Sequence, residues 1–180
     1  AVQMGHVMEP VIGRLAEERL GVQLTKIEEF RTHPKESWLR SHFDFAGVQN
    51  GQTILVECKN YNAAVRSKFD AEAGIIPPAD MAQLVHEAAV FGVQKIYLAV
   101  LFGGQEFFLS PFHIADSQKE DLIKQMAKFW AAVQTRTPLP PESSEEAKLL
   151  FPTAVPDTTV LADSTLEELA TQLFLSLIHI

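Results

Sequence analysis

The chain has 180 residues, of which 47% are hydrophobic, and it carries a formal net charge of −8. This length and composition fit one globular domain with an appendage, and no apolar run approaches the roughly 20 residues needed to cross a bilayer. The single cysteine, Cys58, excludes an intrachain disulfide and a four-cysteine zinc site. We therefore expect a reducing, cytoplasmic setting without membrane attachment.

Apolar spacing and turn residues predict the secondary structure. Pro10 is expected in the first turn of the first helix, Asp80 as the cap of the second, and Gly21 and Gly92 as helix stops. The Asn-Gly pair in "VQNGQ" predicts a tight hairpin between two strands. The expected order is helix 9–21, strand 22–34, strands 38–47 and 52–60, helix 81–92, strands 95–104 and 106–112, helix 119–134, and helix 164–177.

This order predicts a mixed central sheet flanked by helices, which is an α/β architecture. Three segments are expected: a compact core over residues 1–135, a linker rich in Pro, Ser and acidic residues over 136–163, and a C-terminal helix over 164–180. The sequence starts without Met and ends on an apolar run, so we expect both the core and the last helix to be truncated.

Charged side chains end the otherwise apolar strand "QTILVECKN". Glu57 and Lys59 are two residues apart and share one face, whereas Cys58 points the other way and is expected to be a small buried hydrophobe. A hairpin folding at Asn50-Gly51 would bring Asp44 near Glu57, within reach of one ion. Two carboxylates suit Mg²⁺, and the Cys58 backbone carbonyl offers a further oxygen.

Lys59 would then lie beside the ion, where a lysine can orient or deprotonate an attacking water or offset charge on a phosphate. The set Asp44, Glu57 and Lys59 therefore has a use in phosphodiester hydrolysis. The alternative from spacing alone is a solvated strand end, because a Glu-Lys pair is common at such positions.

Six stretches together resemble the YqaJ-like viral recombinase family, the lambda-type alkaline exonucleases within the PD-(D/E)XK nuclease superfamily. The resemblance covers nearly the whole chain apart from its last residues. The stretches are "GHVMEP", "SWLRSHFDFAG", "ILVECKN", "AQLVHEAAVFGVQKIYLAVLFGGQEF", "FWAAVQTRTPLPP" and, less specifically, "EAKLLFP". The resemblance implies a restriction-endonuclease-like core with a mixed sheet, so residues 1–135 would be a nuclease core.

The resemblance also implies roles for particular residues. Asp44 and Glu57 would be metal ligands assisted by the Cys58 carbonyl, and Lys59 would be the catalytic lysine. Glu9 matches a helix glutamate near the metals, and Gln83 matches a glutamine on the helix that borders the site. From the residues alone, Glu9 is only a carboxylate that the start of a helix favours, and Gln83 is an ordinary polar helix position.

Basic residues near these motifs are candidate contacts to DNA phosphates, although each also fits a solvated surface. Arg66 and Lys68 follow the Glu-X-Lys strand directly and are therefore preferred. The full set is Arg31, Lys35, Arg40, Arg66 and Lys68. The sequence departs from the family pattern in having Asp44-Phe45 where Asp-Gly is usual. By the resemblance, we expect the given sequence to begin after an upstream segment that helps such enzymes bind the 5′ phosphate at a DNA end.

By resemblance, the expected function is 5′-to-3′ digestion of one strand at double-stranded DNA ends, with Mg²⁺ or Mn²⁺, during phage-type recombination. The same resemblance implies a phage or prophage origin, a homotrimer, and a single-strand annealing protein as partner. Two alternatives remain. One is a non-catalytic DNA-binding or interaction module that keeps the fold, which the acidic balance favours. The other is a PD-(D/E)XK endonuclease.

Overall fold

The structure is a computed structural model that describes residues 2–70, 73–153 and 164–178. Its elements divide into two compact units, Ala1–Thr137 and Pro138–Ile180. The second unit holds α4 (Ser144–Leu150) and α5 (Ser164–Ile178). Helix α4 lies inside the segment predicted as a linker, where Ser143 caps it by accepting the Glu146 N–H. In the described part of the chain, no helix is long and apolar enough to cross a membrane.

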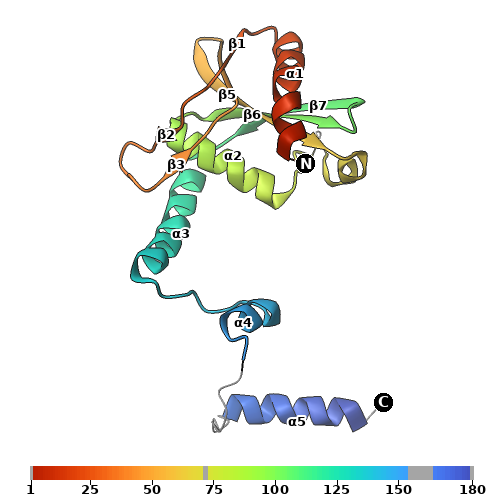
Figure 1. Cartoon of the computed structure of the whole chain (residues 1–180), viewed down its shortest axis with the longest axis vertical. Helices are drawn as coiled ribbons and strands as arrows, with labels where there is room; N and C mark the ends of the chain where they lie inside the picture. Colours follow the sequence, from red (N-terminus) through yellow and green to blue (C-terminus); the bar gives the residue numbers. More distant parts are fainter. Residues whose placement is uncertain (1, 71–72, 154–163, 179–180) are drawn as a thin grey trace. The chain divides into compact units, whose positions relative to one another are not determined.

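A five-stranded sheet forms the centre of the first unit, in the order β1-β4-β5-β6-β7 (Figure 1). Only β5 and β6 run parallel, whereas the other neighbours are antiparallel. The strands are β1 (Leu24–Lys26), β4 (Phe45–Gln49), β5 (Gln52–Tyr61), β6 (Lys95–Phe102) and β7 (Glu106–His113). The predicted mixed sheet flanked by helices is confirmed.

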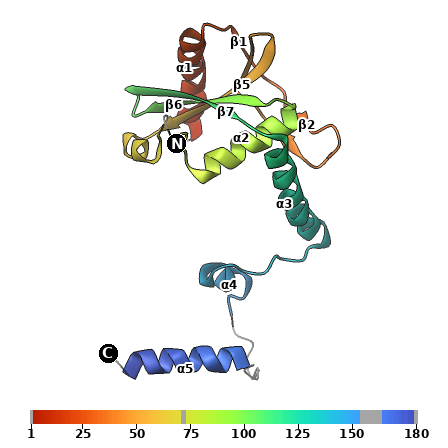
Figure 2. The same cartoon turned by 180° about the vertical axis from the view of Figure 1, so that it is seen from behind.

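Helices cover both faces of this sheet (Figures 1 and 2). Helix α1 (Val2–Leu20) lies on one face, where Ile12 and Ala16 pack with Ile54 and Val56 of β5. Helix α2 (Pro78–Phe91) lies on the other face, and α3 (Asp116–Thr135) contacts α2. Strand β5 therefore carries buried apolar side chains on both faces before its polar end.

The Asn-Gly hairpin is confirmed. Asn50 has φ 52° and Gly51 φ 77°, as a two-residue type I′ turn requires, and the turn joins β4 to β5 with Phe45 paired to Val56. Both predicted glycine helix stops are also confirmed, since Gly21 (φ 62°) follows α1 and Gly92 (φ 83°) caps α2. Glycine adopts this left-handed conformation without strain.

Two long strand predictions were wrong. Residues 22–34 form β1 and the separate β2 (Arg31–Thr32): contact with the β4 side ends at Ile27, whose N–H donates to the Asp44 carbonyl (3.0 Å), and β2 pairs with another strand. Residues 38–47 likewise split into β3 (Arg40–Ser41), which pairs with β2, and β4. Asp44 lies in the bend between β3 and β4 rather than on a strand.

Two helix-start predictions were also wrong. Helix α1 begins at Val2, so Pro10 and Glu9 lie inside it instead of in its first turn; the burial of its apolar face outweighs the proline penalty. Asp80 does not cap α2, whose N-cap is Pro77. The Asp80 side chain is buried instead, and its Oδ1 accepts a hydrogen bond from the Tyr61 hydroxyl (2.7 Å).

Between β5 and α2 the chain forms a 3₁₀ helix, η1 (Ala63–Lys68), and a bridge between Asp70 and Ile75. Asn62 caps η1 by accepting the Ala64 N–H (2.9 Å). This segment carries two of the basic residues predicted to contact DNA.

Candidate active site

The carboxyl-terminal part of β5 presents Glu57, Lys59 and Tyr61 toward α2. Alternation along the strand places these three side chains on one face, while Cys58 packs with the apolar residues beneath α1. Glu57 is only 5% exposed. A buried carboxylate requires compensation by hydrogen bonds or opposite charge, so its partners define the site.

Helix α2 supplies these partners from one polar stripe. Gln83 donates through Nε2 to Glu57 (2.7 Å) and Glu87 (2.7 Å), and its Oε1 accepts from Lys59 Nζ (2.6 Å). One turn earlier, Asp80 accepts from Tyr61. Residues 80, 83 and 87 recur at helical spacing, so β5 and α2 face each other through a polar layer inside an otherwise apolar core.

Lys59 is held by both an ion pair and an amide. Its Nζ lies 2.9 Å from Glu57 Oε1 in addition to its bond with Gln83. Burial by itself would lower the pKa of Lys59, but Glu57, through its charge and hydrogen bond, and the charges of Asp80 and Glu87 raise that pKa above its ordinary value. The lysine is therefore cationic at neutral pH.

Asp44 approaches Glu57 from the bend that directly precedes β4, the other strand of the hairpin. Extending the register by one step from the Phe45–Val56 pair places Asp44 opposite Glu57. Its Oδ2 accepts the Cys58 N–H (2.7 Å), which takes the place of a ladder bond at this end of β4. The predicted approach of Asp44 to Glu57 is confirmed.

The Cys58 backbone also faces the place where Asp44 and Glu57 oppose each other, which we call the corner. The N–H and C=O of one strand residue point to the same side of the strand, and the N–H is directed at Asp44. We therefore expect the carbonyl oxygen to face Asp44 as well. Burial and the nearby charge of Asp44 raise the pKa of the Cys58 thiol, which makes the side chain a poor nucleophile.

The carboxylates repel one another. Burial, followed by the charge of Glu57, raises the pKa of Asp44 to about 7. The same two causes raise the pKa of Glu87 to about 9. Burial and the charge of Glu57 both disfavour the ionised carboxyl groups here, and a bound cation would oppose both effects.

Glu9 reaches this region from α1. It pairs with Lys26 of β1 (3.2 Å) and lies 3.8 Å from His6. The charge of Glu9 contributes to the raised pKa of Asp44. Glu9 also raises the pKa of Lys26, first through their hydrogen bond and then through its charge. Helix α1 comes this close because Gly13 packs directly on the Phe45 ring, where a Cβ atom would be 2.5 Å from ring carbons.

The donor set fits Mg²⁺ with few protein ligands. Among the described residues, no group of three or more His, Cys, Asp or Glu side chains is arranged to hold a metal ion. The available oxygens are those of Asp44, Glu57 and the Cys58 carbonyl. Mg²⁺ usually keeps several waters and takes one or two carboxylates, so this small set suits it, whereas a metal that needs a full protein cage would not fit.

The basic residues that were predicted to contact DNA lie apart from one another in the structure. Arg66 pairs with Glu106, donates to the Phe69 carbonyl (2.8 Å) and stacks near Phe102 and Phe108. Arg31 stacks on Phe91 (3.9 Å), and Lys68 is exposed on η1. Lys35 lines a pocket between the segment after β2 and α3.

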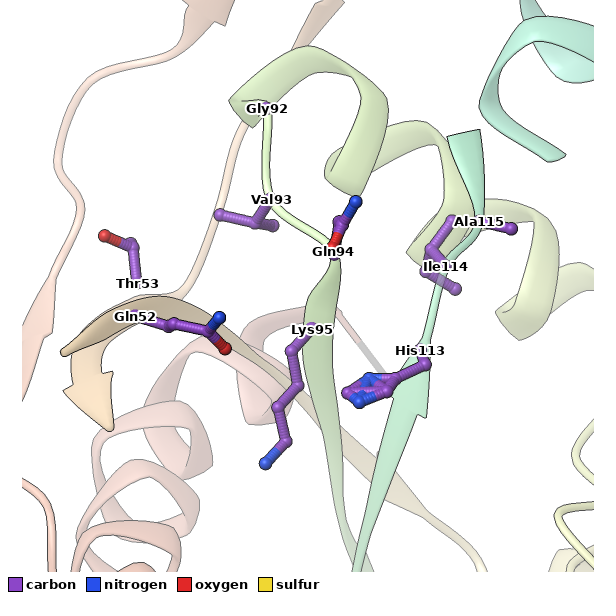
Figure 3. A pocket seen from close by; sticks show the side chains of 9 residues that line it. All are labelled: Gln52, Thr53, Gly92, Val93, Gln94, Lys95, His113, Ile114 and Ala115. Carbon is purple, nitrogen blue, oxygen red and sulfur yellow. The ribbon is translucent and has the colours of Figure 1, made fainter. Parts of the chain in front are cut away.

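Arg40 alone of this set lines a groove that reaches the site. The groove has a volume of about 540 Å³ and also includes Gln83 and Glu87. A second cavity of about 690 Å³ lies at the opposite end of the sheet, beside the start of β5 and of β6 (Figure 3). Its Lys95 and His113 side chains come from paired positions on β6 and β7.

Sequence reasoning missed Glu87, Asp80 and Lys26 as parts of this region. The pattern that could have found Glu87 is a charged residue on the α2 face that also carries Leu84 and Ala88, four residues after Gln83. No comparable sequence pattern points to Lys26, because its pairing with Glu9 depends on how β1 and α1 pack together.

Comparisons with known proteins bear on this site. A family model described as the YqaJ-like viral recombinase domain matches residues 1–94. The curated "Uncharacterized protein YqaJ" of Bacillus subtilis (strain 168) is 26% identical over 132 residues, which are 72% of this chain and 40% of the relative. The chain thus spans less than half the length of that relative.

Two solved structures share the fold. An alkaline exonuclease (LHK-Exo) from Laribacter hongkongensis matches with a TM-score of 0.62 and 15% identity, covering 76% of this chain and 70% of the exonuclease. LHK-Exo in complex with dAMP matches with a TM-score of 0.61 and 16% identity, covering 82% and 72%. These likenesses show a shared fold, and the predicted mixed central sheet flanked by helices is confirmed.

Proposed function

Since the chain belongs to the YqaJ-like viral recombinase domain family, we propose that it is a metal-dependent exonuclease acting on double-stranded DNA ends. The observation that carries this proposal is the corner where Asp44 and Glu57 oppose each other beside the cationic Lys59. The fold shared with an alkaline exonuclease supports it. In phage-type recombination, such an enzyme would digest the 5′-ended strand and leave a single strand for annealing.

Each residue has a chemical task in this proposal. Asp44, Glu57 and the Cys58 carbonyl would hold Mg²⁺, with Mn²⁺ as an alternative, and the ion would polarise a phosphoryl oxygen and make water more acidic. Lys59, which is protonated, would orient the attacking water and offset charge that builds on the phosphate. Gln83 would hold Lys59 and Glu57 in place, and Glu9 would add negative charge from α1.

A cleavage assay on the full chain tests this function. We expect linear duplex with a 5′ phosphate to be degraded with Mg²⁺ while closed circles survive, and labels at the 5′ and 3′ ends to give the direction. Lys59→Ala should lower the rate by about 10²- to 10⁴-fold, because the positioned cation is lost. EDTA should abolish degradation, and Mn²⁺ should restore it.

The other outcomes separate the alternatives. Cleaved circles would identify an endonuclease. DNA binding without cleavage under every metal condition would support a non-catalytic DNA-binding module. A homotrimer and a single-strand annealing partner belong to the same proposal, and light scattering of the purified protein tests the first.

A further inference from the structure

A groove connects the candidate active site to a cluster on the surface that the proposed function does not use. The groove runs between α2, α3 and the β3 segment. One end holds Glu87 and Gln83, and Gln83 donates to both Glu57 and Glu87. Its lining residues are Arg40, Ser41, His42, Ala82, Gln83, His86, Glu87, Leu122 and Met126.

An aromatic ring and two nitrogen-rich side chains gather at the rim of this groove. Phe30 is 51% exposed, and its ring centroid lies 5.6 Å from the Arg40 guanidinium carbon and 5.9 Å from the His42 ring. Arg40 and His42 are exposed and line the groove themselves. A lone exposed phenylalanine needs no explanation, but here the ring is set beside a cation and an imidazole.

The rim is held in place. His86 of α2 lies with Nε2 2.9 Å from the Arg40 carbonyl, which ties β3 to the helix that carries Gln83. Strand β3 is further fixed by its pairing with β2, where Arg31 faces Ser41. The guanidinium of Arg40 stays exposed while its backbone is anchored, so it can meet a ligand without reorganising the strand.

The chemistry of the rim and groove fits an unpaired nucleotide strand. Leu122 and Met126 give the groove an apolar wall that suits bases. Phe30 offers a ring face on which a base can stack, and the side chains of Arg40 and His42 suit phosphates. Exposed Glu28 and Glu29 adjoin Phe30, which disfavours a phosphate directly at the ring and leaves that place to a base. A duplex keeps its internal base faces stacked inside the helix, so only its terminal pair could reach an aromatic platform.

We propose that Phe30, Arg40 and His42 form a subsite for unpaired nucleotides, from which one strand follows the groove to the active site. This inference rests on the proposed function, whose substrate it narrows to ends that are frayed or carry an overhang. The base stacks on Phe30, and the adjoining phosphate pairs with Arg40.

Binding measurements on the full chain test this subsite. A short single strand that carries 2-aminopurine and a blunt duplex of the same sequence are titrated in EDTA, so that no cleavage occurs. Phe30→Ala should weaken single-strand binding about tenfold and remove the fluorescence quenching caused by stacking. Phe30→Trp should keep both, and duplex binding should stay within about twofold.

Phe129→Ala is the matched control, because Phe129 is a similarly exposed phenylalanine (59%) on α3 outside the groove lining. Equal losses in the Phe30 and Phe129 variants, an unchanged single-strand affinity in Phe30→Ala, or an equal loss of duplex binding would overturn the subsite. Circular dichroism checks the fold of Phe30→Ala, and Phe30→Tyr serves as the conservative second variant. Because cleavage is not measured, intact single-strand binding in a protein that does not degrade DNA would overturn the exonuclease proposal alone.

Discussion

One side-chain amide organises the candidate active site. Gln83 uses both of its N–H donors on carboxylates and its oxygen on Lys59, so every hydrogen-bonding position of the amide except one lone pair has a partner. Glu87 supports this orientation together with Glu57, because its Oε1 accepts from the NH₂ end while the amide oxygen accepts from Lys59. If the site is catalytic as proposed, we expect Glu87 to act as a positioning residue through Gln83.

Replacing Glu87 tests this role. In Glu87→Leu the Gln83 amide loses one of the two acceptors that support its orientation, and we expect kcat on linear duplex to fall about 10- to 100-fold with little change in KM. Glu87→Gln keeps an acceptor oxygen and should retain most of the activity. A Gln variant as impaired as the Leu variant would show that the charge, and not the orientation of Gln83, is what matters.

The raised carboxyl pKa values predict how stability depends on pH without metal. The pKa of Asp44 rises from 3.8 to about 7 and that of Glu87 from 4.5 to about 9, so the folded state binds more protons than the unfolded state in between. This contribution to stability is complete below about pH 4 and is lost as pH rises through 7 and then 9. Urea unfolding in EDTA should therefore show a falling free energy of unfolding from pH 6 to 9.

Glu87→Gln should flatten the upper part of that fall, between pH 7 and 9, because it removes the group that titrates there. Glu18→Gln, at an exposed position on α1, is the control and should leave the slope unchanged. Identical slopes in all three proteins would rule out Glu87 as the source.

Close packing between α1 and β4 determines where Glu9 lies. Gly13→Ala would place a methyl group 2.5 Å from the Phe45 ring, and such overpacking costs about 1 to 3 kcal/mol. Gly5→Ala on the same helix meets nothing within 4 Å and should be neutral or stabilising by up to about 1 kcal/mol. Thermal unfolding measures both variants, and an equal effect of the two would contradict the packing argument.

Local sequence patterns predicted some helices and strands correctly and others wrongly. The Asn50-Gly51 hairpin, the strand of Glu57 and the glycine helix stops follow from short-range conformational rules, and the structure has them. The start of α1 and the breaks at Ile27 and Asp44 depend on distant partners: the apolar face under α1 and the Cys58 N–H. No pattern within 22–34 or 38–47 reports those contacts.

The same distinction holds for the site. Alternation and turn length were enough to bring Asp44, Glu57 and Lys59 together. Glu87 and Asp80 entered the polar layer only because α2 lies antiparallel to the end of β5, which is a tertiary arrangement. The resemblance, and not the spacing, identified Gln83, and the structure places it among these charges.

For the whole molecule, the division after Thr137 predicts the effect of shortening the chain. Removing residues 138–180 should change the stability of the first unit by less than about 0.5 kcal/mol, because its core lies within Ala1–Thr137. Removing α3 as well should destabilise it strongly, since Leu122, Ile123 and Met126 pack on the core and Trp130 stacks on Trp38. Similar losses from both truncations, measured by urea unfolding, would refute this division.

The bond between Asp44 and the Cys58 N–H also provides an internal probe of the corner. Because a side chain rather than a neighbouring strand protects this amide proton, its exchange with deuterated solvent depends on where the Asp44 carboxylate lies. Protons deeper in β5, such as that of Val56, exchange only when the sheet itself opens. The ratio of the two rates therefore separates a local rearrangement of Asp44 from loosening of the whole fold, without any substitution in the protein.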